Sequence, residues 1–116
     1  MSSENRDFVH FFDNSLDMLC IAGLDGYFKT LNPAWSRTLG YTTKELVAEP
    51  YINFIHPDDL QNTLHEAAKL NQGETTILFE NRYRCKDGTY RWLLWQASPD
   101  LTRGLIYASA RDISPR

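Results

Sequence analysis

The chain has 116 residues, the size of one ordinary domain, and its 12 basic and 15 acidic residues give a net charge of −3. That charge argues against a general nucleic-acid binder, which would carry a basic excess. No apolar run approaches the ~18 residues of a membrane span, and the polar N-terminus is not a secretory signal. Two distant cysteines form no disulfide framework, so we expect a cytoplasmic protein.

Three phenylalanines share one face of the first predicted helix. Residues 4–15 are typical of a short amphipathic helix, whose apolar face carries Phe8, Phe11 and Phe12 at i, i+3 and i+4. These rings either cover the sheet of their own domain or make a self-complementary contact in a dimer, since a dimer interface uses the same patch on both subunits. The pattern leaves both interpretations open.

A hairpin follows this helix. The runs 18–22 and 27–31 are apolar and predict two strands. Asp25-Gly26 lies between them and is a strong hairpin signal, because glycine adopts positive φ at no steric cost. The first quarter of the chain therefore predicts one helix and two antiparallel strands.

Two short helices come next. Asn32-Pro33 is typical of an N-cap and a first helical residue, and Gly40 ends this helix. Thr42 and Glu45 have the spacing of a capping box, in which each side chain accepts a hydrogen bond from the other residue's backbone. They predict a second helix that ends before residue 50.

The third and longest predicted helix begins at His56 and ends at Gly73. Its apolar stripe is formed by Leu60, Leu64, Ala67 and Ala68. His56, Asp58, Asp59 and His65 are the one cluster where a metal or acid–base site is conceivable. The two histidines, however, lie nine positions apart, roughly 180° around a helix, which misses the i, i+4 ligand geometry. We therefore interpret Asp58 and Asp59 as helix-capping residues and expect no metal site.

The last part of the chain predicts three strands. They span residues 77–85, 90–97 and 105–111, with a hairpin turn at 87–88 and a longer turn over 98–104. Strands grouped at both ends of a chain around a helical middle indicate an α+β fold. We expect a five-stranded antiparallel sheet with the short helices packed on one face.

The strand 90–97 is apolar on both faces. Trp92 and Leu94 face one side, whereas Leu93 and Trp95 face the other. A strand with one face in water would alternate apolar and polar residues. We therefore expect the helices to cover one face of the sheet, and a partner or the N-terminal helix to cover the other.

No catalytic constellation stands out. Nothing resembles a GxGxxG or Walker loop, and no Gly-x-Ser-x-Gly elbow is present. The segments around Cys20 and Cys85 contain no histidine, so a cysteine–histidine pair is not indicated. We expect no catalytic residue, and a small stand-alone enzyme is the weakest of the hypotheses.

Four segments, in their order and spacing, resemble a PAS domain, the sensor module of bacterial signalling proteins. They read LDMLCIAGLDGYFKTLNPAWSRTLGYTTKEL, FIHPDDL, FENRYRCKDGTYRWLLWQASP and GLIYASARDIS. The resemblance covers residues 13–114, and its Arg-Tyr-Arg, Lys-Asp-Gly and Arg-Trp section looks like the PAC half of the family. It implies a five-stranded antiparallel sheet wrapped by short helices, and a sensory rather than a catalytic role.

The resemblance also implies how a signal leaves the domain. In the family the last strand ends in Asp-Ile-Thr, which leads to an effector, and here Asp112, Ile113 and Ser114 take those places. We expect a homodimer that relays a signal to an effector, either a histidine kinase or a cyclic-dinucleotide enzyme, with the kinase favoured. The implied organisation is a cap helix over 1–16, a PAS/PAC domain over 17–114 and the start of a linker at 115–116. The alternative is a ligand-free module that only sets dimer geometry.

The resemblance allows two cofactors to be tested. Light-sensing flavin members carry a cysteine in the central helical region, but residues 50–55 contain none, so we expect no flavin–cysteine adduct. Haem-binding members use a histidine of the long helix. His65 lies on that helix but about 100° around from Leu64, away from the predicted interior, so we expect no haem.

A small organic ligand between helix and sheet is the remaining possibility. Its candidate lining residues are Phe54, Phe79, Tyr83 and Trp95. Pockets of this kind are lined by aromatic side chains. The alternative is that the rings fill that space themselves, and we favour this second interpretation because packed interiors leave few voids.

Overall fold

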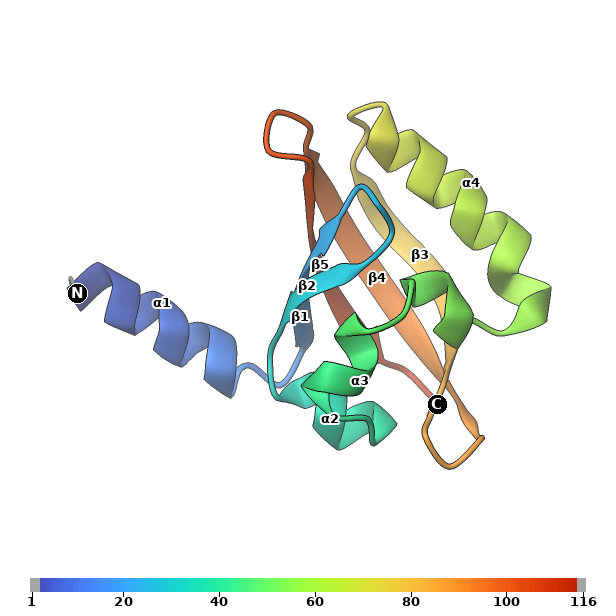
Figure 1. Ribbon diagram of the computed structural model, residues 1–116, viewed down its shortest axis with the longest axis horizontal. Helices are drawn as coiled ribbons and strands as arrows, with labels where there is room; N and C mark the ends of the chain where they lie inside the picture. Colours follow the sequence, from blue (N-terminus) through green and yellow to red (C-terminus); the bar gives the residue numbers. More distant parts are fainter. Residues whose placement is uncertain (1–2, 115–116) are drawn as a thin grey trace.

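The computed structural model describes residues 3–114, and its centre is a five-stranded antiparallel sheet (Figure 1). The strands are β1 (Met18–Gly23), β2 (Phe28–Leu31), β3 (Thr76–Arg84), β4 (Tyr90–Asp100) and β5 (Leu105–Asp112). They lie in the order β2-β1-β5-β4-β3, so the last strand occupies the middle of the sheet. The predicted α+β fold is confirmed.

The helices lie mostly on one face of this sheet. They are α1 (Ser3–Asn14), α2 (Ala34–Leu39), α3 (Thr43–Val47) and α4 (Leu60–Asn71), with short 3₁₀ turns η1 (Tyr51–Phe54) and η2 (Pro57–Asp59). Helices α2, α3 and α4 pack on what we term the inner face, whereas α1 projects away from the body of the domain (Figure 1). Within residues 3–114, no helix has the length and hydropathy needed to cross a bilayer.

Aromatic rings form the centre of the core. Trp35 is fully buried, and its ring lies 4.8 Å from Phe28, 5.8 Å from Trp95 and 6.0 Å from Tyr83, measured between centroids. Its indole Nε1 donates a hydrogen bond to the Leu19 carbonyl oxygen at 3.0 Å. Tilted ring pairs of this kind contribute about 1 kcal/mol each beyond the area they bury. The cluster fixes the distance between α2 and the sheet.

Several local predictions are confirmed. Thr42 and Glu45 form both hydrogen bonds of the capping box, at 3.1 and 2.9 Å. Trp35 and Leu39 share the buried face of α2. Gly26 and Gly88 both have positive φ, near 90°, as the two predicted hairpin turns require.

The prediction that Asn32 caps a helix is wrong. Pro33 takes the N-cap position of α2, and Asn32 is buried. Its Oδ1 accepts a hydrogen bond from the Leu19 N–H at 2.9 Å. Its Nδ2 donates to the carbonyl oxygens of Phe12 and Asp17 at 3.0 and 2.9 Å. Because one amide pairs three backbone groups, Asn32 joins the end of α1 to the first strand.

The predicted apolar stripe of α4 is also wrong in part. Leu64 is 41% exposed and Ala68 is exposed, whereas the helix turns Thr63, Ala67 and Leu70 toward the sheet. The reason is that Thr63 meets a polar partner on the sheet, described below. The pattern of apolar residues alone therefore predicted the wrong face of α4, because the buried face includes a polar residue.

The end of β4 and the register of β3 also differ from the prediction. Strand β4 continues to Asp100 and pairs with β5 from Leu93 to Asp100, so the predicted turn 98–104 shrinks to residues 101–104. In β3 the register shifts between Thr76 and Phe79, and Ile77 and Leu78 are both exposed. A bulge of this kind breaks strict alternation, so two consecutive apolar side chains face the solvent.

Candidate functional site

A cavity of about 80 Å³ lies between α4 and the inner face of the sheet. Three of the four predicted lining residues, Phe79, Tyr83 and Trp95, form part of its wall. Phe54 does not, because η1 turns its ring against Tyr41, 5.1 Å away between centroids. The aromatic rings therefore pack closely but leave a space beneath α4, contrary to the interpretation that they fill it.

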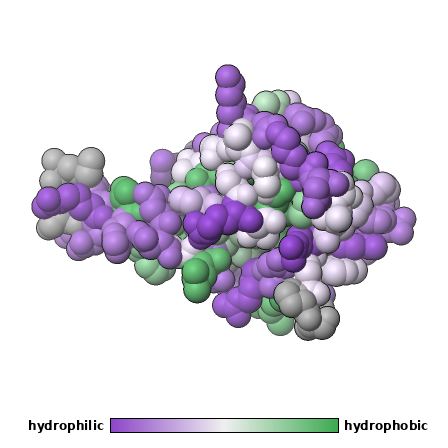
Figure 2. Space-filling view, turned by 90° about the horizontal axis from the view of Figure 1, so that it is seen from below, coloured by the Kyte–Doolittle hydropathy of each residue, from purple (hydrophilic) through white to green (hydrophobic). Residues whose placement is uncertain are grey.

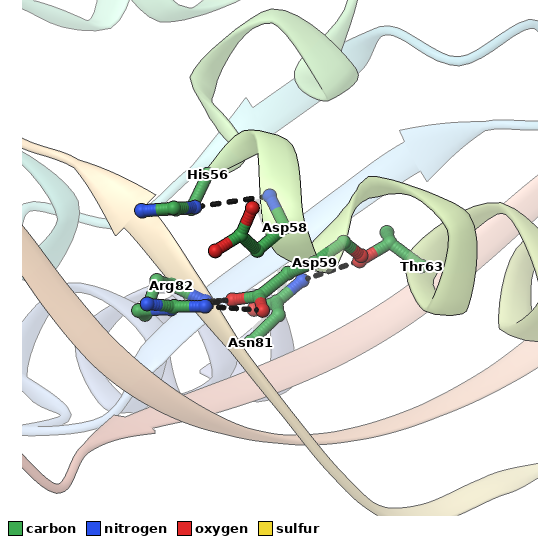
Figure 3. Close-up of polar contacts among 6 residues, drawn as sticks. All are labelled: His56, Asp58, Asp59, Thr63, Asn81 and Arg82. Carbon is green, nitrogen blue, oxygen red and sulfur yellow. Dashed lines mark hydrogen bonds and ion pairs between the residues drawn. The ribbon is translucent and has the colours of Figure 1, made fainter.

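The start of α4 is fastened to the sheet by an ion pair (Figure 3). Asp59 accepts hydrogen bonds from the Arg82 guanidinium at 2.8 and 2.9 Å, and from the Arg82 backbone N–H at 2.7 Å. The side chains are only 14% and 25% exposed. The hydrogen bond from Arg82 lowers the pKa of Asp59, and the same bond raises the pKa of Arg82. The pair is therefore charged at neutral pH.

The helix-capping interpretation of Asp58 and Asp59 holds only for the position of Asp59, which is the N-cap residue of α4 but makes no side-chain capping bond. The side chain that caps the η2 turn is His56, whose Nδ1 accepts the Asp58 N–H at 3.0 Å (Figure 3). Asp59 instead faces Arg82. His65 is exposed on α4 and does not line the cavity. Among residues 3–114, no group of three His, Cys, Asp or Glu side chains is arranged to hold a metal ion.

A buried polar chain runs from this ion pair into the cavity wall. Thr63 Oγ1 donates to the Asp59 carbonyl oxygen at 2.8 Å and accepts from Asn81 Nδ2 at 3.1 Å. Asn81 Oδ1 in turn accepts the Trp95 Nε1 hydrogen at 2.7 Å. Sequence reasoning missed Asn81. The available signal was its place between Phe79 and Tyr83 at alternating spacing, which puts an amide on the inward face of β3.

The three predicted relay residues lie against β4, next to Trp92. The Trp92 N–H donates to Ser114 Oγ at 2.6 Å, and the Trp92 carbonyl oxygen accepts the Ile113 N–H at 2.9 Å. Asp112 accepts the Ser114 N–H at 2.9 Å and pairs with Arg91 at 3.4 Å. The predicted linker residues 115–116 lie outside the described residues.

Arg82 connects this junction to α4. Its guanidinium carbon lies 4.7 Å from the centre of the Trp92 ring, close enough for a cation–π interaction. Arg82 and Trp92 are also direct cross-strand partners on β3 and β4. One arginine therefore contacts both the start of α4 and the strand that holds Ser114. Neither Arg82 nor Trp92 was predicted to have this role.

The predicted dimer residues lie on the projecting helix. Phe8 and Phe11 are 64% and 68% exposed, so they do not cover the sheet of their own domain. Figure 2 shows α1 extending from the body, with hydrophobic residues among its hydrophilic ones. Phe8 and Phe12 stack at 6.3 Å and form one wall of a groove of about 480 Å³ beside the outer face of the sheet, opposite Ile77 and Tyr107.

A comparison with protein families finds one match. A family described as "PAS fold" matches residues 28–103, which is most of the chain. The match begins after α1 and ends just before β5. No curated protein sequence matches the chain.

Solved structures share the whole fold. A PAS domain from Colwellia psychrerythraea superimposes with a TM-score of 0.83 at 23% identity, covering 97% of this chain and 99% of its own. A domain of the sensory box sensor histidine kinase/response regulator from Geobacter sulfurreducens gives 0.81 at 23% identity, covering 94% of each chain. The PAS domain of the HTR-like protein from Haloarcula marismortui gives 0.81 at 22% identity, covering 97% of this chain and 100% of its own.

Proposed function

Because this chain belongs to the PAS family of sensory domains, we propose that it is a cytoplasmic input domain that forms a homodimer and passes a conformational signal through its C-terminal end. The effector in this proposal is a histidine kinase of a two-component system, the kind of protein that contains the similar Geobacter sulfurreducens domain. Catalysis belongs to that effector and not to residues 1–116. Both cysteines are buried and free, which fits a reducing compartment.

The observation that supports the relay is the continuous path of contacts from α4 to Ser114. A signal requires two domain states that a stimulus binds with different affinity. A shift of α4 would displace Asp59, and with it the Arg82 guanidinium that lies over Trp92. The Trp92 backbone holds Ser114, so the displacement reaches the point from which the chain leads to the effector.

A kinase fusion tests the relay. The whole chain is joined after its last residue to a histidine kinase core, and basal autophosphorylation is measured. We expect Trp92→Ala to change that rate about fivefold or more, the usual lower range of coupling between two sites. The control is Leu101→Ala, which removes a similarly exposed apolar side chain at the opposite end of β4. If both variants leave the rate at the wild-type value, the relay path is wrong.

The exposed phenylalanines of α1 support the homodimer. An apolar stripe that contacts water in the monomer gains stability when a second copy covers it. A two-fold axis would bring the same stripe together from both subunits, which suits a helix that extends beyond its own domain. The groove beside the outer face adds apolar area next to the stripe.

Light scattering tests this dimer. We expect wild type to be dimeric and the double variant Phe8→Glu/Phe12→Glu to be monomeric, because two carboxylates would be desolvated in each half of the contact. His10→Glu/Asn14→Glu is the matched control, since these two exposed residues have the same i, i+4 spacing on the polar side of α1. The stripe is not the interface if the phenylalanine variant stays dimeric.

A second candidate function is the sensing of a small molecule. The observation that favours it is the cavity under α4, because the same helix carries the first contact of the relay path. An occupant of this cavity would touch the helix that the relay begins with.

A further inference from the structure

The wall of the cavity under α4 is almost entirely carbon and sulfur. Small or apolar side chains of β1 and β5 form part of its floor, namely Cys20, Ala22, Ile106 and Ala108. On the helix side it is lined by Ala67 and Leu70, together with Thr63 and Glu66. Almost no polar atom reaches the cavity surface. Burial raises the pKa of the Cys20 thiol to about 12, so at neutral pH this group is uncharged as well.

The polar side chains near the cavity are engaged with one another. Thr63 and Asn81 belong to the chain that ends at Trp95 Nε1. Thr76 Oγ1 donates to Glu66 at 3.0 Å, and Glu66 also accepts from Lys69 at 3.0 Å. Within residues 3–114, no buried side-chain nitrogen or oxygen lacks a hydrogen-bond partner.

These two observations restrict the chemistry of any occupant. A charged or strongly polar molecule would lose its hydration and find no unpaired group to replace the lost hydrogen bonds, at a cost of several kcal/mol. It would otherwise have to break a satisfied buried pair, which is equally unfavourable. An apolar molecule has no hydrogen bonds to water to lose, and it gains dispersion contacts with the carbon-lined wall.

The volume restricts its size. The cavity has a volume of about 80 Å³. Apolar cavities of about 150 Å³ stay free of water and bind benzene or xenon. A smaller cavity of the same character accepts xenon readily and admits benzene as its upper limit.

We propose that the cavity beneath α4 binds a compact, uncharged, apolar molecule no larger than benzene, and excludes carboxylates and larger polar metabolites. That such a molecule acts as the stimulus rests on the proposed function, whereas its binding does not. A bound molecule would contact Ala67 and Leu70 and so favour one position of α4 over another. The first turn of α4 is joined to Arg82 through Asp59, which accepts hydrogen bonds from both Thr63 and Arg82.

The test follows backbone amide signals of the whole chain by ¹H–¹⁵N NMR during titration with xenon, with benzene and with benzoate. We expect saturable shifts with xenon and benzene, centred on the lining residues of α4 and β1. Benzoate has the same ring plus a carboxylate, and we expect at least tenfold weaker binding. Benzoate binding as tightly as benzene, or an absence of saturable shifts with both apolar probes, would overturn the proposal.

Two adjacent alanines of α4 provide a matched pair of variants. Ala67 lines the cavity and Ala68 is exposed on the same helix. We expect Ala67→Leu to fill the space and weaken benzene binding at least tenfold, and Ala68→Leu to leave it unchanged. Ala22→Val narrows the cavity from β1 and should likewise weaken binding, which keeps the test available if the helix variant folds poorly. Benzene binding at wild-type strength in a folded Ala67→Leu variant would place the probe elsewhere and refute the assignment.

Failure of this inference and failure of the proposed function are distinguishable. Binding is measured on this chain alone, and the relay is measured in the kinase fusion. If benzene binds as expected but leaves the autophosphorylation of a Trp92-sensitive fusion unchanged, the binding site stands and its role as the stimulus site is refuted. If the fusion responds to Trp92→Ala but the domain binds neither apolar probe, the relay stands and the ligand assignment fails.

Discussion

Helices α1 and α4 each have 12 residues and an amphipathic pattern, yet they are used in opposite ways. Helix α4 turns Leu70 into the core, where it is 8% exposed, and α1 leaves Phe11 68% exposed. Both helices adjoin the sheet through an acid–arginine pair. At α4 the pair is Asp59–Arg82, held by several short hydrogen bonds, and at α1 it is Asp17–Arg111, a single 3.4 Å contact in solvent.

The difference shows that an apolar stripe does not by itself identify its partner. The stripe of α4 is weak as a sequence pattern, because the polar residues Thr63 and Glu66 line the cavity beside Ala67 and Leu70, but its partners are in the same domain. The stripe of α1 is strong as a pattern and has few partners in the domain. A strong apolar pattern therefore predicts that a helix face is buried. Whether it is buried within this chain or against another molecule depends on the fold.

The first test of the comparison removes one apolar side chain from each helix. We expect Leu70→Ala to lower the free energy of unfolding by about 3 kcal/mol, since it deletes buried carbon atoms and enlarges an existing cavity. Phe11→Ala should change it by less than about 0.5 kcal/mol in dilute protein, because its ring is already in water. Urea unfolding of both variants measures the contrast. Equal losses would mean that α1 packs on its own domain.

The second test breaks the ion pair that fastens α4. We expect Asp59→Ala to lower the free energy of unfolding by about 2 kcal/mol, because it leaves the half-buried Arg82 guanidinium without its acceptor. Asp58→Ala is the control and should lower the free energy of unfolding by less than about 0.5 kcal/mol, since the Asp58 backbone N–H, and not its exposed carboxylate, donates to His56 Nδ1. Equal losses of unfolding free energy in the two variants would show that the Asp59–Arg82 pair does not fasten α4 to the sheet.

The Asp59 effect should also depend on pH. Arg82 holds the pKa of Asp59 below its ordinary value in the folded protein, whereas the unfolded chain has a value of about 3.9. The stabilisation is therefore complete above that pH and is lost as the pH falls through the folded-state pKa. The difference between wild type and Asp59→Ala should shrink in acid, as measured by urea unfolding at a series of pH values. If the difference in unfolding free energy stayed constant down to pH 2, the ion pair with Arg82 would not be the reason that Asp59 stabilises the fold.

The fold could be predicted from the sequence because its signals are local. The Asp-Gly turns, the Thr42 and Glu45 capping box and the apolar run over residues 90–97 each depend on neighbouring residues. Most strand positions follow from these, and the antiparallel sheet follows from the strands. The resemblance to a PAS domain rested on the same segments.

The site was harder to predict because its contacts join distant residues. Asp59 and Arg82 are 23 positions apart, and their pairing depends on how η2 meets the edge of the sheet. Asn32 has the residue type of a helix cap, but its buried position lets it bond three backbone groups instead. The cavity was not expected, since whether rings fill a space depends on packing that no periodicity records.

The smallest expected effect is at the junction of α1 with the sheet. The Asp17–Arg111 pair has side chains 39% and 69% exposed, so water and salt screen it, and such pairs contribute between about 0 and 1 kcal/mol. We expect Arg111→Ala to change the free energy of unfolding by less than about 0.5 kcal/mol, with no further change at 0.5 M salt. Arg82→Ala is the matched control and should cost about 2 kcal/mol, as Asp59→Ala does. If Arg111→Ala costs as much as Arg82→Ala, an exposed pair fixes α1, and the two helices are attached to the sheet in the same way after all.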